Sequence, residues 1–152
     1  MDSIDRRIIR ELQKDGRKTL SDLAEAVGLS ATPCARRLDR LQSDGVIKGY
    51  AAQVDAAKVG LPVTVFVSVE LEQQARGGIE AFERAIAGFD EVMECHLMTG
   101  SRDILLRVVV EDLAGFDRFL ETRLMAVPGI RNMRSNFALR TMVRRDVLPV
   151  RG

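Results

Sequence analysis

Residues 19–45 read TLSDLAEAVGLSATPCARRLDRLQSDG, and apolar side chains recur along this stretch at helical spacing. The first apolar stripe ends at Gly28, where a glycine is expected to close a helix. A second stripe follows Ser30, a good N-cap residue, and ends at the Asp-Gly pair 44–45. Pro33 fits the first turn of that helix, because the N–H that proline lacks would have no partner there. The stretch therefore predicts two helices joined by a turn of about three residues.

The flanking residues extend this pattern on both sides. A helix is predicted over Asp2–Lys14, with Ile4, Ile8, Ile9 and Leu12 on one face and Asp15-Gly16 as its stop. After the pair at 44–45, residues 46–54 predict two short extended pieces around Gly49, as a small hairpin or wing. Three helices followed by a wing indicate a winged helix-turn-helix, which places its second motif helix in the major groove of DNA.

The 30–43 helix carries the candidate DNA-binding side chains. At about 100° per residue its apolar positions fall on one side, while Thr32, Arg36 and Arg40 point the opposite way and Arg37 flanks them. Arginine pairs with guanine, threonine meets a base edge or methyl group, and a helix N-terminus favours phosphate. Such a face can also be merely solvated, but the preceding helix and turn favour DNA binding. The predicted DNA-binding residues are Ser30, Thr32, Pro33, Arg36, Arg37, Arg40 and Lys48.

The composition changes to strand-like after Pro62. Strands are predicted over 63–71, 91–98, 103–110 and 130–139, and helices over 78–87 and 113–124. The order βαββαβ indicates a ferredoxin-like fold with both helices on one face of an antiparallel sheet, so the chain is expected to be α+β. The predicted organisation is a DNA-binding domain at 1–54, a linker at 55–61, a ligand-sensing and oligomerisation domain at 62–143, and an irregular tail at 144–152.

Charge and chemistry narrow the function classes. The net charge is only +1, so DNA contact must come from locally placed arginines and not from bulk charge. Cys34, Cys95 and the one histidine, His96, have no metal-ligand spacing, and no phosphate-binding or dinucleotide motif is present. In a strand, Cys95 and His96 point to opposite faces and cannot act as a nucleophile and base pair. We expect no enzyme activity, no metal and no cofactor, and no secretory signal or membrane span is visible.

The motifs quoted above also resemble a known family. The segments are IIRELQKDGR (8–17), LAEAVGLSATPCARRL (23–38), GVIKGY (45–50), ECHLMTG (94–100) and LMAVPGI (124–130). Together, in this order and register, they resemble the leucine-responsive/asparagine-regulator (Lrp/AsnC) family over nearly the whole chain. The resemblance implies a cytoplasmic, nucleoid-associated homodimer or octamer. It also implies a transcription regulator that binds double-stranded DNA and responds to an amino acid through its C-terminal domain.

The pattern of the second domain predicts association independently. The strand at 103–110 is almost wholly apolar, and Phe66 lies on the face of its strand opposite the other apolar residues. An uncovered apolar sheet face is unstable in water, and a second copy of the sheet is the simplest cover. A two-fold dimer would favour pseudo-palindromic sites with half-sites about one helical turn apart, or a multiple of it.

The turn between the second and third predicted strands is the candidate effector site. Thr99, Gly100, Ser101, Arg102 and Asp103 are predicted to line it, with Asp103 holding an ammonium group and backbone amides holding a carboxylate. In the family, an aromatic residue usually precedes this Asp, whereas this sequence has Arg102 at that position. The arginine would favour an acidic or polar ligand, or would abolish sensing, and a plain hairpin turn is the other interpretation. Weaker candidates are Arg134, Ser135 and Asn136.

The sequence is compatible with three function classes. The favoured one is a sequence-specific regulator of amino-acid metabolism genes that an amino acid modulates. The second is an enzyme with a ferredoxin-like core, against which the missing motifs stand. The third is an architectural protein that wraps DNA with little sequence preference, and the family resemblance allows a mixture of the first and third.

Overall fold

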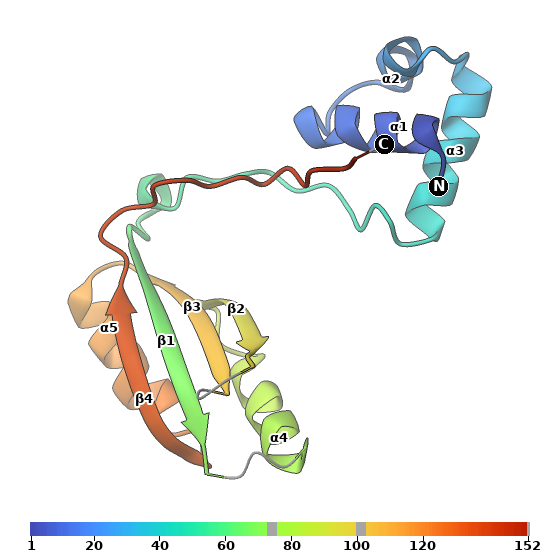
Figure 1. Cartoon of the computed structure of the whole chain (residues 1–152). Coiled ribbons are helices and arrows are strands. Elements are labelled where there is room, and N and C mark those ends of the chain that lie inside the picture. The colour runs from blue at the N-terminus through green and yellow to red at the C-terminus, as the bar shows by residue number, and fades with distance from the viewer. Residues whose placement is uncertain (73–75, 100–102, 152) are drawn as a thin grey trace. The chain divides into compact units, whose positions relative to one another are not determined.

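The computed structural model describes residues 1–72, 76–99 and 103–151. For residue 76 it describes only the backbone. The chain divides into two compact units. The first consists of Met1–Gln53 together with Met142–Gly152, and the second of Val54–Thr141. The elements of both units are labelled in Figure 1.

Three helices form the first unit, as the sequence predicts. They are α1 (Ser3–Lys14), α2 (Leu20–Val27) and α3 (Ala31–Ser43). Asp2 caps α1 and shares a reciprocal capping box with Asp5, while the Thr19 side chain accepts a hydrogen bond from the Asp22 N–H at the start of α2. Gly28 ends α2 with φ 73°, a left-handed conformation that glycine adopts without steric cost.

The apolar stripes of these helices meet in one small core. Leu23, Ala24 and Val27 from α2 pack with Cys34 from α3 and with the helices on either side. The fully or nearly fully buried members of this core are Ile8, Leu23, Ala24, Val27, Cys34 and Leu41. Burial raises the pKa of the Cys34 thiol, so this side chain serves as a small apolar group and not as a nucleophile.

The segment predicted as two extended pieces over 46–54 forms no hydrogen-bonded strand. Among the described residues, 44–56 contain turns and irregular backbone but no strand. Ile47 alone packs on the helical core, while Val46 and Tyr50 are about half exposed. A hairpin is stable when alternate side chains of its strands are buried, and in this segment only Ile47 packs on the core. Gly45 and Gly49, both at positive φ, further interrupt an extended backbone.

The second unit has the predicted βαββαβ order. A short 3-10 turn at Ala57–Val59 leads into it. The elements are β1 (Val63–Leu71), α4 (Arg76–Ile86), β2 (Val92–Leu97), β3 (Ile104–Val110), α5 (Leu113–Phe119), the π-helical turn η2 (Leu120–Leu124) and β4 (Ile130–Phe137). The strands pair antiparallel in the order β2-β3-β1-β4. Both α4 and α5 lie on the same side of the sheet (Figure 1).

One face of this sheet is filled and the other is open. Val65, Val67 and Val69 of β1 are fully buried against helix side chains such as Phe82 and Phe116. Because side chains alternate along a strand, Phe66 points to the opposite face, where it is 37% exposed. In the β1–β3 register Phe66 lies opposite Arg107. The helices therefore cover only half of the sheet, which leaves Phe66 facing outward.

Candidate nucleic-acid interface and effector site

The start of α3 presents the side chains that the sequence assigns to DNA. Thr32 and Arg36 are exposed, and Pro33 is half-buried in the first turn. Ser30 occupies the N-cap position of α3, but its side chain makes no capping hydrogen bond, in contrast to Asp2 on α1 and Thr19 on α2. The first backbone N–H groups of α3 therefore have no side-chain acceptor at the cap.

The two other arginines of α3 are bound to α1. The Arg37 guanidinium donates to Asp5 Oδ1 at 2.8 Å and to Asp2 Oδ2 at 2.7 Å. Arg40 Nη2 donates to Asp5 Oδ2 at 2.7 Å. Arg40 is exposed, as the sequence predicts, but its guanidinium also contacts Asp5 and does not project freely outward. The long side chain turns back to a buried carboxylate.

Asp5 is the residue that brings these groups together. Its side chain has no exposed surface, and it also accepts a hydrogen bond from the Asp2 N–H at 2.9 Å. A buried carboxylate is costly unless it is paired and hydrogen-bonded, so both guanidinium groups are needed here. One side chain thus closes the N-terminus of α1 and fixes α3 against it.

The charge state of this cluster follows from its contacts. Burial raises the pKa of the Asp5 carboxyl, but the hydrogen bond from the Asp2 N–H and the two guanidinium groups outweigh it, and the net shift is downward. The pKa of Asp2 is lowered from 3.8 to about 2, first by its hydrogen bond with the backbone of Asp5 and next by that with Arg37. Both carboxylates are therefore charged at neutral pH.

The remaining basic candidates differ in whether they form ion pairs. Lys48 is exposed in the irregular segment after α3. Lys18, just before α2, pairs with Glu11 Oε2 at 2.7 Å and is mostly buried. Within the described part of the chain, Arg36 and Lys48 form no ion pair, so among the predicted DNA-binding residues they are the basic groups most available to a polyanion.

The predicted effector turn is only partly described. Gly100, Ser101 and Arg102 lie outside the described residues, and Thr99, two residues after β2, is exposed. Asp103 is 8% exposed, and its Oδ2 accepts a hydrogen bond from the Leu71 N–H at 2.8 Å. This carboxylate therefore ties the start of β3 to the end of β1. One of its oxygens already has a structural partner.

The weaker candidates on β4 lie on different faces. Arg134 and Asn136 are exposed, and the register places them opposite Ser68 and Phe66 on the open side of the sheet. Ser135 is half-buried and lies opposite Val67, a core residue. Arg134 and Asn136 therefore belong to the rim of the open face, and Ser135 to the helix-covered side.

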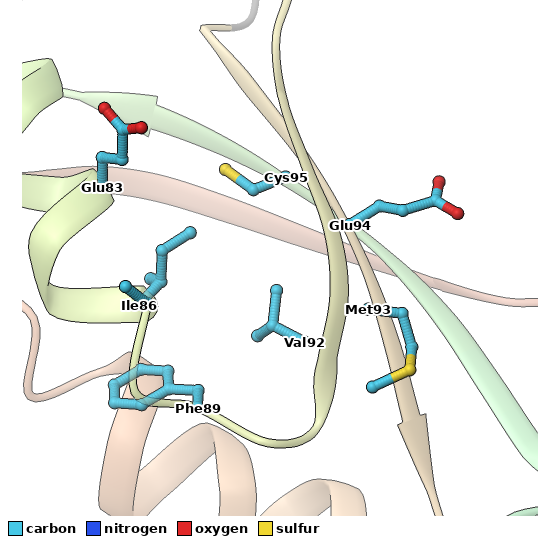
Figure 2. Close-up of a pocket in the computed structure, with 8 residues that line it drawn as sticks. Glu83, Ile86, Phe89, Val92, Met93, Glu94 and Cys95 are labelled. Carbon is cyan, nitrogen blue, oxygen red and sulfur yellow. The ribbon is translucent and has the colours of Figure 1, made fainter. Parts of the chain in front are cut away.

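A shallow hollow of about 200 Å³ lies between α4 and β2. Its lining is mainly apolar, with Ile86, Phe89 and Val92 on its floor, and Figure 2 shows the Cys95 sulfur pointing toward Glu83 and Ile86. Burial, and next the charge of Glu83, raise the pKa of the Cys95 thiol, which disfavours the reactive thiolate.

His96 is engaged on the other side of β2. Its Nε2 lies 3.2 Å from Glu94 Oε2, and Arg107 Nη2 donates to Glu94 Oε1 at 2.7 Å. Cys95 lies opposite Leu106 and His96 opposite Leu105, so consecutive side chains are on opposite faces, as the sequence predicts. Among the described residues, no three metal-ligating side chains come together, and no helix is long and apolar enough to cross a membrane.

Two family models match the chain on either side of residue 54. A winged helix-turn-helix DNA-binding model matches residues 1–48, and the Lrp/AsnC ligand-binding domain model matches residues 64–148. The chain belongs to the Lrp/AsnC family. It is thus a DNA-binding transcription regulator with a ligand-binding domain, and not an enzyme.

Individual Lrp/AsnC proteins are similar over almost their whole length. The Bkd operon transcriptional regulator of Pseudomonas aeruginosa is 43% identical over 150 residues, which cover 99% of this chain and 98% of that protein. The leucine-responsive regulatory protein of Escherichia coli is 38% identical over 135 residues, covering 89% and 82%.

Solved structures agree with this assignment. A transcriptional regulator of Neisseria meningitidis in complex with L-Met has a TM-score of 0.92 at 32% identity and covers 98% of this chain and 96% of its own. An AsnC family regulator of Agrobacterium tumefaciens has a TM-score of 0.92 at 40% identity, covering 98% and 97%. The α+β fold predicted from the sequence is confirmed.

The sequence analysis did not identify the carboxylates that bind the arginines of α3. In particular, it did not identify Asp5. The available signal was the spacing Asp2-x-x-Asp5, since a carboxylate three residues after an acidic cap is typical of a reciprocal capping box. The additional pairing with Arg37 and Arg40 crosses more than thirty residues of chain and left no local pattern.

We expect the stability of the first unit to fall in acid through Asp5. A carboxyl whose pKa is lowered on folding stabilises the fold above its ordinary value of 3.8, and this contribution is lost as the pH falls through the lowered value. The Asp5→Asn variant should lose about 1–3 kcal/mol at neutral pH, because charged hydrogen bonds are removed. Its stability should then vary less between pH 5 and pH 2.

Urea unfolding followed by circular dichroism across this pH range provides the measurement. Asp39→Asn is the matched control, because Asp39 is an exposed carboxylate on α3. An acid dependence of Asp5→Asn that equals that of the unaltered chain would contradict the assignment of Asp5.

Proposed function

We propose that this Lrp/AsnC regulator reads operator DNA through the outer face of α3 and controls genes of amino-acid metabolism. We also propose that an amino acid bound in the second unit modulates it. The observation that carries the DNA part is the exposed position of Arg36 near the start of α3, beside Thr32. The names of the relatives, one of them leucine-responsive and one of a Bkd operon, support the link to amino-acid response.

Arg36 is suited to reading a base. A guanidinium presents two N–H groups that match the N7 and O6 acceptors of guanine in the major groove. The N-terminal turn of α3 supplies Ala31 and Thr32 amides without a side-chain cap, and such amides favour a phosphate. Ser30, Pro33 and Lys48 would contact the backbone around this point and set the register of the helix.

Arg37 and Arg40 take a different part in this proposal. Arg40 is 53% exposed in spite of its bond to Asp5, so its remaining N–H groups could reach a phosphate. Arg37 is 25% exposed and has two carboxylate partners. We therefore assign Arg37 first to holding α3 in place and only second to DNA.

The open sheet face supports association into dimers. On this face Phe66 lies opposite Arg107 and Asn136, and Leu105 and Val109 of β3 share the face, so apolar and polar side chains combine in a surface that suits an interface. A second copy would cover Phe66 by two-fold symmetry, and octamers would be built from such dimers. Two α3 helices related in this way would read a pseudo-palindromic site.

The effector proposal rests on the second unit. The similar regulator of Neisseria meningitidis was solved with L-Met, and the family model for residues 64–148 describes a ligand-binding domain. We place the site at the turn of Thr99, Gly100, Ser101, Arg102 and Asp103, where the second carboxylate oxygen of Asp103 would accept the ammonium group. Arg102 would favour an acidic or polar amino acid. A DNA-bound regulator of this kind would act in the cytoplasm, at the nucleoid.

The first test concerns Arg36. Arg36→Ala should weaken binding to an operator fragment by about 1–3 kcal/mol and relax sequence preference at one base pair. Gel shifts at stated salt with the gene's own upstream region and with random DNA measure both effects. Arg140→Ala, an exposed arginine of the second unit, is the control. An equal loss on every sequence would reduce Arg36 to a phosphate contact.

The second test concerns the open face. Phe66→Asp buries a charge in the proposed interface and should raise the dimer dissociation constant at least about tenfold, measured by analytical ultracentrifugation. Leu113→Asp is the control, because Leu113 is 67% exposed at the start of α5, outside the open face. An unchanged dissociation constant for Phe66→Asp would exclude this face as the interface.

The third test concerns Asp103. Asparagine keeps an oxygen for the Leu71 N–H but removes the charge that would hold an ammonium group. Calorimetry with each common amino acid should detect at least one that binds the unaltered chain, and Asp103→Asn should lose most of that affinity. Binding that survives the substitution would overturn the role of Asp103, and absence of binding to the unaltered chain would overturn the effector proposal.

A further inference from the structure

The C-terminal segment is hydrogen-bonded to α1 by one side chain. Gln13 Oε1 accepts from the Leu148 N–H at 2.6 Å, and Gln13 Nε2 donates to the Leu148 carbonyl at 3.2 Å. A primary amide that meets both backbone groups of one residue recognises extended backbone and not a particular side chain. The Leu148 side chain is 72% exposed, so the contact owes little to apolar burial.

The C-terminal segment contains a local turn that favours this contact. The Val150 N–H donates to the same Leu148 carbonyl at 2.8 Å, which closes a three-residue turn around Pro149. The proline ring fixes φ near the value that an inverse γ-turn requires, so the turn costs little conformational entropy. Gln13 is half-buried near the end of α1, which also limits its freedom. Both partners are thus restricted in conformation, which lowers the entropy cost of the contact.

The connectivity gives the contact a consequence. The chain leaves the first unit near residue 53 and returns to it at Met142. The last strand of the second unit, β4, ends at Phe137, and the Ala138 N–H still donates to the Thr64 carbonyl at 2.9 Å. Only residues 139–141 therefore separate the sheet network from the returning segment.

We propose that α1 carries a docking site for the chain's own C-terminal segment, with Gln13 as the residue that binds Leu148. The docked segment gives the DNA-binding unit a second attachment to the ligand-binding unit, in addition to the connection after residue 53. Two attachments allow fewer relative orientations than one, which raises the effective concentration of the second α3 once the first is bound to DNA. This last step rests on the proposed function, whereas the docking itself does not.

The experiment compares full-length Gln13→Ala with the unaltered chain in two measurements. Amide hydrogen exchange at Leu148 should become at least about tenfold faster, because the acceptor of its N–H is removed. Affinity for a fragment with two half-sites should fall by about five- to twentyfold, while affinity for a single half-site should stay within about twofold. Leu148→Pro removes the same N–H from the side of the tail and should reproduce the DNA result.

The control is Gln53→Ala, which removes an exposed glutamine of the same unit and should change neither measurement. Unchanged exchange at Leu148 in Gln13→Ala would overturn the docking site. Faster exchange with unchanged two-site affinity would overturn the second attachment, as would an equal loss on single and paired half-sites. If the unaltered chain bound no DNA, the proposed function would fail, but the exchange measurement would still decide the docking.

Discussion

The orientation of the DNA-binding helix depends on the buried carboxylate of Asp5. It accepts hydrogen bonds from Arg37 and Arg40 on α3 while it closes the first turn of α1. A charge without exposed surface is tolerated only because these partners surround it. The small apolar core brings the helices together, and the ion pairs fix the rotation of α3. This rotation leaves Arg36 outward.

The second unit depends on a different constraint, the alternation of side chains along its strands. Valines at every second position of β1 fill the space beneath the helices, which sends Phe66 to the uncovered face. The same alternation separates Cys95 from His96 and denies the pair any joint chemistry. The alternation of side chains therefore explains both the outward position of Phe66 and the separation of Cys95 from His96. The exposed face agrees with a DNA-binding regulator that carries a ligand-binding domain.

The two candidate sites were predictable to different degrees. The exposed positions of Thr32 and Arg36 were predictable, because helical periodicity alone places these residues opposite Cys34 and Leu41. Arg40 shares that periodicity, but its length lets it reach back to Asp5, which no spacing rule reveals. The segment predicted as a wing, 46–54, forms no hydrogen-bonded strand, because a single anchor, Ile47, does not define a strand face. At Asp103 the residue was chosen for its charge, and the structure adds its bond to the Leu71 N–H.

The sequence alone determined the order of helices and strands, since caps, glycines and apolar periods act over a few neighbouring residues. It also determined the family, through motifs in register along the chain. Only the tertiary structure decided where long polar side chains end, because their partners lie far away in sequence. Asp5 meets Arg40 across 35 positions, and Gln13 meets Leu148 across 135. Such contacts depend on how the helices and the tail pack, and no local pattern encodes them.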